Sequence, residues 1–253
     1  MITNKLYVWI NIFVFVGSIG WVATDHNSFE PWIFMLSTLA TLVFQIFSYR
    51  RYEILQESSN KKISWQEFEK KFQYLKKISV LGLGNVGKTT LIENICRLEN
   101  QNIQTQGKVA YITKLSASKS KFVAILDASG QSQSLQNDIG LESEVIIILI
   151  DHNDSDLINR IDRDRLRSHE IFISLFIDRL HTKEFKPKTI FLLLNKQDLW
   201  GGRNNKDELL HFFNQMTVKI KNSFPSSEII GLHFSNSVTS DCSRLIILLS
   251  EKI

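Results

Sequence analysis

The sequence contains few cysteines and no strong excess of either charge. Only two cysteines, Cys96 and Cys242, occur in 253 residues, and no Cys-x-x-Cys pair is present. This scarcity argues against a disulfide framework and against a cysteine zinc site, and it favours two reduced thiols in a cytosolic domain. The net charge is only +4, and no run of Lys and Arg is interleaved with aromatic residues. Neither feature favours binding to nucleic acid.

Two stretches near the N-terminus lack charged residues altogether. Residues 6–23 and 32–49 contain no Asp, Glu, Lys or Arg. Each stretch has about 18 residues, and a helix of that length can cross the hydrocarbon core of a bilayer. The segment TDHNSFEP between them contains Pro31, which predicts a break between the two helices. The pattern therefore predicts a two-helix transmembrane hairpin over residues 1–51.

Basic residues flank this hairpin on one side. Lys5 precedes the first stretch, Arg50 and Arg51 follow the second, and the turn between them has neither Lys nor Arg. The positive-inside rule then places both termini and the rest of the chain in the cytoplasm. A cleaved signal peptide and a pair of buried core helices are the alternatives. The second span and the aromatic residues near the span ends favour the membrane hairpin.

Polar side chains form a stripe on the second predicted span. Its members are Ser37, Thr41, Gln45 and Ser48, which recur at helical spacing. Such groups seek polar partners in a membrane, so the stripe fits either packing of the two helices or formation of a homo-oligomer. An ion path is disfavoured because no ionisable residue lies within either span.

An amphipathic linker helix is predicted over residues 52–77. Ser64 and Glu67 match a capping box. Apolar residues then recur at helical spacing, at Trp65, Phe68, Phe72 and Leu75. This apolar face fits packing on the following domain, and the lysines opposite it leave contact with anionic lipid as the alternative.

Residues 82–89 read GLGNVGKT, which matches G-x-x-x-x-G-K-[ST] between an apolar strand and a helical run. The pattern predicts a loop whose backbone N–H groups, together with the N-terminus of the next helix, face phosphate oxygens. Lys88 is expected to reach the β- and γ-phosphates, and the Thr89 hydroxyl to bind Mg²⁺. The candidate phosphate-binding residues here are Gly82, Gly84, Asn85, Gly87, Lys88, Thr89 and Thr90.

Residues 127–131 read DASGQ and follow another apolar strand. Asp127 at the strand end can hold Mg²⁺ directly or through water. The N–H of Gly130 can meet the γ-phosphate, and Gln131 can orient the attacking water. This segment therefore supplies candidate metal-binding and catalytic groups.

Residues 195–198 read NKQD after a further apolar strand. The carboxylate of Asp198 can accept two hydrogen bonds from the N1–H and N2–H₂ edge of guanine, and adenine has no such pair of donors. The stem of Lys196 can lie on the base, and Asn195 can tie this loop to the phosphate-binding loop. The motif predicts GTP and GDP, with Mg²⁺, rather than ATP as the ligands.

These motifs follow one another at the carboxyl ends of predicted strands, where open α/β sheets bind ligands. Over residues 78–253 the pattern resembles the Ras-like superfamily of GTPases. The segments VIIILIDHNDSD and NKQDL are similar to Arf-type members. The hydrophobic segment ahead of the domain is similar to that of an Arf-related protein, the beta subunit of the signal recognition particle receptor. Gly84 departs from this pattern, because Arf-type loops usually carry an acidic residue there.

The resemblance implies further site residues. Family members place a threonine on a mobile loop that senses Mg²⁺ and the γ-phosphate. Thr105 lies near the family spacing, and Thr113 is the second candidate. The last guanine-binding loop falls on Ser235 and Asn236, where Asn236 replaces the usual alanine. The candidate catalytic residues are thus Lys88 and Gln131, and the candidate metal ligands are Thr89, Thr105 and Asp127.

The fold class predicted from these segments is α/β. Strands are expected near residues 78–82, 108–115, 120–127, 144–151, 188–195 and 228–234, and helices near 88–99, 160–181, 206–222 and 241–252. Their alternation predicts a P-loop fold with a six-stranded, mostly parallel, doubly wound sheet. The short connection between the second and third strands makes that pair an antiparallel hairpin, with one antiparallel edge strand.

Several other charged residues are predicted to be solvated. The segment DHNDSD at 151–156 lacks the glycine and the distal glutamate of a calcium loop, so it is expected to be a surface loop. Surface or capping roles are expected for His152, His169 and His181. A solvated helix face is expected for Arg160, Arg163, Arg165 and Arg167.

Together these features predict a membrane-anchored protein that binds GTP and hydrolyses it slowly with Mg²⁺, as a switch at the cytoplasmic membrane face. A protein partner would then be needed for rapid hydrolysis. The alternative is a GTP-loaded membrane receptor or scaffold with little hydrolysis. An ATPase or kinase is disfavoured by N-K-x-D, and a nucleotide-gated pore is disfavoured by the uncharged spans.

Overall fold

The computed structural model describes residues 2–98, 105, 107–115, 121–155, 160–202 and 206–253. The chain divides into two compact units, Met1–Ser58 and Ser59–Ile253. The structural boundary therefore lies at residue 58, and the second unit takes in residues 59–77.

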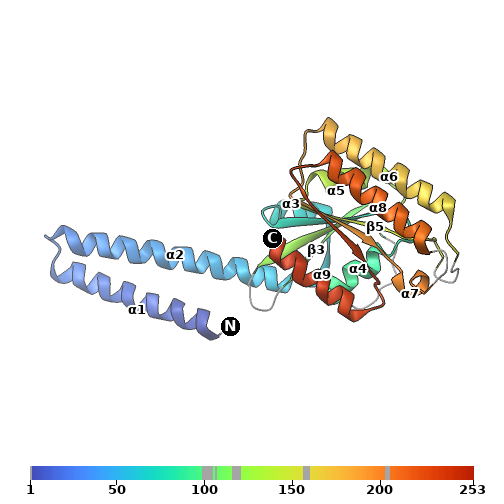
Figure 1. The fold of residues 1–253 in the computed structure, drawn as a ribbon. Helices are drawn as coiled ribbons and strands as arrows, with labels where there is room; N and C mark the ends of the chain where they lie inside the picture. The colour runs from blue at the N-terminus through green and yellow to red at the C-terminus, as the bar shows by residue number, and fades with distance from the viewer. Residues whose placement is uncertain (1, 99–104, 106, 116–120, 156–159, 203–205) are drawn as a thin grey trace. The chain divides into compact units, whose positions relative to one another are not determined.

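The first unit is a helical hairpin of α1 (Ile2–Thr24) and α2 (Phe29–Glu57), which lie side by side in Figure 1. Tyr7–Thr24 and Phe29–Glu57 are long and apolar enough to cross a membrane, each with a mean hydropathy of 1.6. The expected break between the helices is confirmed at residues 25–28, but it ends before Pro31, because α2 begins at Phe29 and includes this proline in its first turn. Backbone N–H groups in the first turn have no partner within the helix, so proline is tolerated there.

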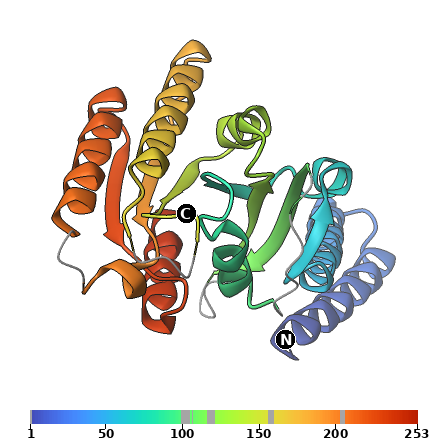
Figure 2. The same ribbon diagram turned by 90° about the vertical axis from the view of Figure 1, so that its right-hand side faces the viewer.

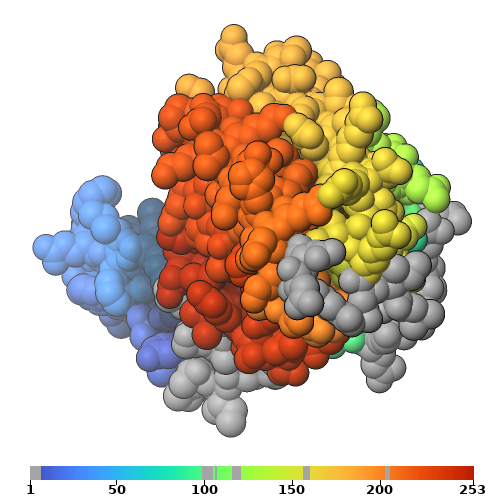
Figure 3. Space-filling model, turned by 45° about the vertical axis from the view of Figure 1, so that its right-hand side comes forward, coloured from blue at the N-terminus to red at the C-terminus, as the bar shows by residue number. Residues whose placement is uncertain are grey.

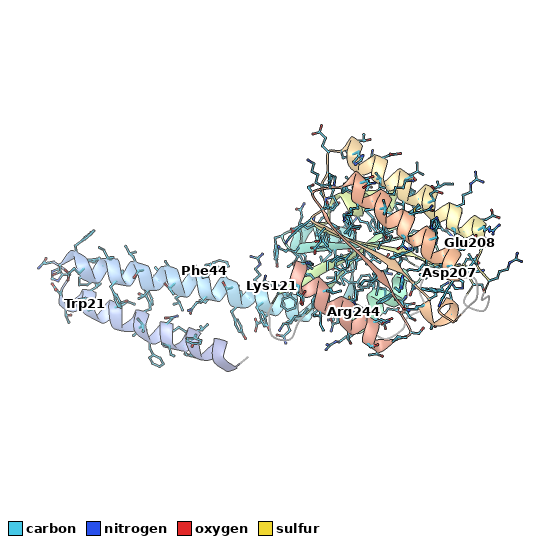
Figure 4. The ribbon with its side chains drawn as sticks, viewed as in Figure 1. Trp21, Phe44, Lys121, Asp207, Glu208 and Arg244 are labelled. Carbon is cyan, nitrogen blue, oxygen red and sulfur yellow. The ribbon has the colours of Figure 1, made fainter. Side chains whose placement is uncertain are left out.

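One contact between the two helices joins small polar groups, and another joins the rings of Trp21 and Phe34. Ser18 is 1% exposed, and its Oγ lies 3.3 Å from Oγ1 of Thr38. The exposed Ser37 and Thr41 instead donate to carbonyl oxygens of their own helix, at 2.8 Å each. Aromatic side chains such as Phe44, labelled in Figure 4, remain exposed. Packing within the hairpin therefore uses Thr38, which lies outside the predicted stripe.

The second unit is built on one sheet. Among the described residues its strands are β1 (Lys61–Ser64), β2 (Lys76–Leu81), β3 (Lys108–Lys114), β4 (Phe122–Ala128), β5 (Val145–Ile150), β6 (Thr189–Leu194) and β7 (Glu228–His233). They are ordered β1-β3-β4-β2-β5-β6-β7. β3 runs antiparallel to both β1 and β4, and the remaining neighbours are parallel. The six predicted strands are all present, with β1 as a seventh.

β1 corrects the prediction for residues 52–77, which do not form a single linker helix. Residues 52–57 extend α2, and 61–64 pair with β3. Between residues 58 and 77 only α3 (Trp65–Lys71) is helical, and Ser64 caps it by accepting a hydrogen bond from the N–H of Glu67. Phe68 and Phe72 are fully buried. The apolar face therefore packs on the domain, which disfavours the lipid contact considered above.

The predicted hairpin is formed by β3 and β4, with Lys108 opposite Ala128 and Lys114 opposite Phe122. Most of its predicted turn, residues 116–120, lies outside the described residues. β3 is the antiparallel strand that was expected at the sheet edge. It is not at the edge, because β1 occupies that position.

Helices cover both faces of the sheet, as Figures 1 and 2 show. α4 (Lys88–Cys96) and α9 (Thr239–Lys252) lie on one face. α5 (Gln133–Leu141), α6 (Arg163–Thr182) and α8 (Lys206–Ser223) lie on the other. α6 and α8 also appear next to each other in the space-filling view of Figure 3. The short helices α5 and α7 (Gln197–Trp200) are absent from the sequence prediction.

The strand directions determine where a site can form. β5 and β6 are buried at every position, so the sheet is covered on both faces at its centre. β2, β4, β5, β6 and β7 all run in the same direction. Their carboxyl ends therefore share one edge, and the loops that leave this edge are brought together.

Candidate functional site

A cleft of about 680 Å³ lies at this edge. Its walls come from the loops after β2, β4, β5, β6 and β7, from the start of α4 and from Thr105 ahead of β3. All but one of the sequence-predicted site residues line it, namely Gly84, Asn85, Gly87, Lys88, Thr89, Thr90, Thr105, Asp127, Gly130, Gln131, Asn195, Lys196, Asp198, Ser235 and Asn236. Segments separated by more than 100 residues are thus assembled into one concave surface.

Gly82 is the predicted residue that does not line the cleft. Its φ is +146°, and a Cβ there would lie 2.6 Å from the carbonyl oxygen of Leu149. Its N–H donates to Oε1 of Gln136 at 2.8 Å. Gly82 therefore lies outside the cleft lining, where the absence of a side chain permits close packing on β5.

Gly87 permits contact between the two ends of the cleft. Its φ is +93°, and an added Cβ would lie 2.5 Å from Nδ2 of Asn236 and 2.6 Å from Nδ2 of Asn195. Only a residue without a side chain lets these two amides approach the phosphate-binding loop so closely.

Lys88 lies under the same loop. It is 8% exposed, and its Nζ donates to the carbonyl oxygens of Gly82 and Leu83 at 2.9 Å each. Burial lowers its pKa to about 8, against the attraction of Asp127. An added Cβ on Gly130 would lie 2.7 Å from Nζ of Lys88, so the chain after β4 passes directly beside this ammonium group.

Asp127 and Thr105 form the candidate metal site. Oγ1 of Thr105 donates to Oδ2 of Asp127 at 2.7 Å, and both residues are buried. Oδ1 of Asp127 has no hydrogen-bond partner within the part of the chain that the structure describes. Burial raises the pKa of this carboxyl, because a charged oxygen without a partner is costly in the interior. A divalent cation would satisfy that oxygen, so the residues present fit Mg²⁺.

The structure distinguishes between the two candidate switch threonines. Thr113 lies within β3, where its Oγ1 donates to Oδ1 of Asn60 at 3.1 Å. It does not line the cleft, whereas Thr105 lies in it beside Asp127. The geometry favours Thr105.

At the far end of the cleft, hydrogen bonds join the loops after β6 and β7 to the phosphate-binding loop. Nδ2 of Asn195 donates to the carbonyl oxygen of Val86 at 2.9 Å, and its Oδ1 accepts from the N–H of Asn236 at 3.2 Å. Oγ of Ser235 donates to Oδ1 of Asp198 at 2.6 Å. The side chain of Asp198 is thereby oriented at the cleft wall by the following loop.

Asp151 is a functional candidate that the sequence prediction missed. It was assigned to a solvated loop, but it is fully buried at the end of β5. Oδ1 lies 2.8 Å from both Nε of Arg165 and Nε2 of His169, and Oδ2 lies 3.0 Å from Nζ of Lys196. Burial by itself would raise the pKa of Asp151, but His169 and Arg165 lower it to about 2. The carboxylate is therefore an ion-pair centre.

The buried cluster of Asp151, Arg165, His169 and Lys196 corrects several predictions. His152 and His169 are fully buried, and burial lowers the pKa of His169. Lys196 lines the cleft as predicted, but its ammonium group binds Asp151 and the carbonyl oxygen of Asn153. Asp154 is exposed as expected, and Asp156 lies outside the described residues.

A signal for the cluster existed in the sequence. Asp151 directly follows a wholly apolar strand, and Arg165 and His169 are four residues apart, which places them on one helix face.

The phosphate-binding loop, the Thr105–Asp127 pair and the N-K-x-D loop on a mostly parallel sheet define a Ras-like GTPase domain. The sequence model of the ADP-ribosylation factor family matches residues 64–233. Because that match covers more than half of the chain, the protein belongs to the ADP-ribosylation factor family.

Two solved structures are similar to this chain. A structure of the mammalian SRP receptor matches with a TM-score of 0.50 and 13% identity, over 70% of this chain and 100% of that chain. Elongation factor SelB from Methanococcus maripaludis, in complex with the GTP analogue GPPNHP, matches with a TM-score of 0.47 and 14% identity, over 70% of this chain. The match spans 33% of the SelB chain. No curated protein matches the sequence.

Proposed function

We propose that this protein is a membrane-anchored GTP-binding protein that binds GTP with Mg²⁺ and hydrolyses it slowly, as a conformational switch at the cytoplasmic membrane face. One observation carries the proposal: a single cleft is lined by the phosphate-binding loop, by Thr105 with Asp127, and by Asp198 with Ser235. In the proposal these three sets of groups bind the triphosphate, the metal and the guanine of one nucleotide.

The guanine preference rests on Asp198. Asp198 lines the cleft, and its Oδ1 accepts a hydrogen bond from the hydroxyl of Ser235. A carboxylate has capacity for further hydrogen bonds, and it accepts but does not donate. The N1–H and N2–H₂ edge of guanine supplies two donors for it, whereas adenine presents an acceptor at N1.

The candidate ligands for Mg²⁺ are Thr89, Thr105 and Asp127. Mg²⁺, when bound, neutralises charge on the phosphates. Lys88 adds a buried positive charge beneath the loop, and Gln131 lies at the cleft wall where it can orient a water molecule. The hydrogen bond between Thr105 and Asp127 links Thr105, which precedes β3, to the end of β4. A change in the position of the metal would therefore move both residues.

Slow hydrolysis is expected from the lining of the cleft. No arginine is among the described residues that line it. The nearby Arg165 is engaged by Asp151 and by the carbonyl oxygen of Gly84. Turnover without a partner should therefore be on the order of 10⁻⁴ to 10⁻³ s⁻¹, as for small GTPases that lack an arginine finger. A protein partner that supplies an arginine would accelerate it.

Replacing Gln131 with Leu should lower the hydrolysis rate while GTP affinity stays unchanged, because leucine cannot orient water. Single-turnover hydrolysis and nucleotide titration of the full chain in detergent micelles would measure the two quantities. Gln215→Leu, on the exposed surface of α8, is the matched control. Equal hydrolysis rates in the Gln131→Leu and wild-type proteins would favour the alternative, a GTP-loaded receptor or scaffold with little hydrolysis.

Membrane anchoring is supported by the two apolar helices and by the basic residues Arg50 and Arg51 at the end of the second span. This topology puts both termini and the GTPase domain in the cytoplasm. Ser37 and Thr41 remain exposed on α2 and could pack against a second hairpin in a homo-oligomer.

The direct test of the proposal is a titration of the full chain with GTP, GDP and ATP, with and without Mg²⁺. We expect GTP and GDP to bind far more tightly than ATP, and GTP binding to depend on Mg²⁺. Equal binding of ATP would contradict the proposal and favour a membrane-bound ATPase.

A further inference from the structure

Arg165 reaches the phosphate-binding loop from α6. Its Nη2 donates to the carbonyl oxygen of Gly84 at 2.7 Å. The two residues are 81 positions apart in the chain. The sequence prediction placed Arg165 on a solvated helix face, but only 12% of its side chain is exposed. This contact is the cluster's direct link to the phosphate end of the cleft.

Asp151 fixes the direction of this arginine. Nε of Arg165 donates to Oδ1 of Asp151 at 2.8 Å, and Nη2 lies 3.3 Å from Oδ2. A planar guanidinium held at two positions by a buried carboxylate has little freedom to rotate. Nη2 is thereby aimed at Gly84.

The carbonyl oxygen of Gly84 belongs to the same peptide group as the N–H of Asn85. None of the residues that the structure describes has a cis peptide bond. The C=O and N–H of a trans peptide point in opposite directions. The hydrogen bond from Arg165 to the oxygen of Gly84 therefore also sets the direction of the Asn85 N–H. Asn85 has a φ of +61° and lines the cleft with Gly84. A positively charged donor on the oxygen also polarises the amide and strengthens its N–H as a donor.

We propose that Arg165 is a positioning residue of the nucleotide site, which fixes the Gly84–Asn85 peptide so that the N–H of Asn85 is presented to a phosphate oxygen of the nucleotide. This inference rests on the proposed function and extends it. Asp151 also binds Lys196 of the N-K-x-D motif. One carboxylate therefore supports the phosphate end and the base end of the site together.

The test compares ligands with and without the phosphates. The full chain in detergent micelles is titrated with GDP and, by competition, with guanosine, and its thermal unfolding is recorded without nucleotide. Arg165→Met removes the hydrogen bond to Gly84. Arg165→Lys keeps a positive charge near Asp151, but an ammonium group cannot hold both Asp151 and Gly84 as the guanidinium does. This variant therefore tests the hydrogen bond to Gly84 while the ion pair with Asp151 is retained.

In both variants GDP affinity should fall by about tenfold, the loss expected for one hydrogen bond from a charged donor. Guanosine affinity should change little, because Asp151 keeps His169 and Lys196 as partners. Arg163→Met is the control. Arg163 lies two residues earlier on α6, its side chain is 82% exposed, and it pairs with Glu208, which Figure 4 labels on α8. It should leave both affinities unchanged.

Two results would overturn the inference. One is unchanged GDP affinity in both Arg165 variants. The other is an equal loss of guanosine and GDP affinity, which would give Arg165 a role in the fold alone. A wild-type chain that binds neither ligand would instead contradict the proposed function, and the inference with it.

Discussion

Replacing Asp151 with alanine is expected to destabilise the GTPase domain by about 3–5 kcal/mol, the cost of removing one partner from a buried ion pair. The substitution would leave Arg165 and Lys196 without their carboxylate, and both side chains are at least seven-eighths buried. His169 would lose the carboxylate contact at its Nε2 and keep the hydrogen bond from the backbone N–H of residue 151. The loops that carry the proposed phosphate-binding and base-binding residues would lose a shared anchor, so nucleotide affinity should fall together with stability.

Denaturant unfolding of the full chain, followed by tryptophan fluorescence, would measure this loss. Asp178→Ala is the matched control, because Asp178 is an exposed carboxylate on α6 that does not line the cleft. It should change stability little. A loss below about 1 kcal/mol for Asp151→Ala would show that the cluster contributes no more than a surface ion pair.

The Asp151 carboxylate also makes the stability of the folded domain depend on pH. The pKa of Asp151 is about 2 in the folded protein and 3.8 for an unperturbed aspartate. Its folded pKa is depressed, so its contribution to stability is present in full above the unfolded value and is lost as the pH falls from 3.8 toward 2. The stability difference between wild type and Asp151→Ala should therefore narrow over that acidic range.

The sequence predicted the central sheet because its two middle strands β5 and β6 are almost wholly apolar. β5 and β6 read VIIILI and TIFLLL, which is typical of parallel strands buried on both faces. The positions of the loop motifs could also be predicted, because the segments GLGNVGKT, DASGQ and NKQD each lie at the end of a mainly apolar strand.

β1 could not be predicted in the same way. The segment Lys61–Ser64 has only one apolar residue, Ile63, and its strand conformation comes from pairing with β3, which lies more than 40 residues later. Tertiary pairing of this kind overrides the local pattern. The adjoining sequence carries a capping box and apolar residues at helical spacing, so a continuous helix was the better fit to local signals alone.

The buried cluster was missed for a related reason. Asp151, Arg165 and His169 are polar residue types that usually lie at the surface, and a sequence shows no pairing between them. Their burial becomes possible only when β5 and α6 pack together, so that each charge is satisfied by the others.

A change of base preference is the largest functional effect that we expect. Asp198→Asn should reduce GTP affinity by about 10²- to 10⁴-fold, because two hydrogen bonds to a charged acceptor are lost or reversed. Xanthine carries a carbonyl oxygen where guanine carries the N2 amino group. The asparagine amide can donate to that oxygen and accept from the xanthine N1–H, so XTP should bind the variant better than GTP does. The matched control is Asp207→Asn, which makes the same change at an exposed carboxylate that Figure 4 labels on α8.

The measurement that tests the central claim most directly is therefore the ratio of GTP to XTP affinity, determined with Mg²⁺ for wild type, Asp198→Asn and Asp207→Asn. The account predicts that wild type and Asp207→Asn prefer GTP, and that Asp198→Asn prefers XTP. An unchanged ratio in Asp198→Asn would show that this carboxylate does not bind the base, and would contradict the assignment of the cleft as a guanine nucleotide site.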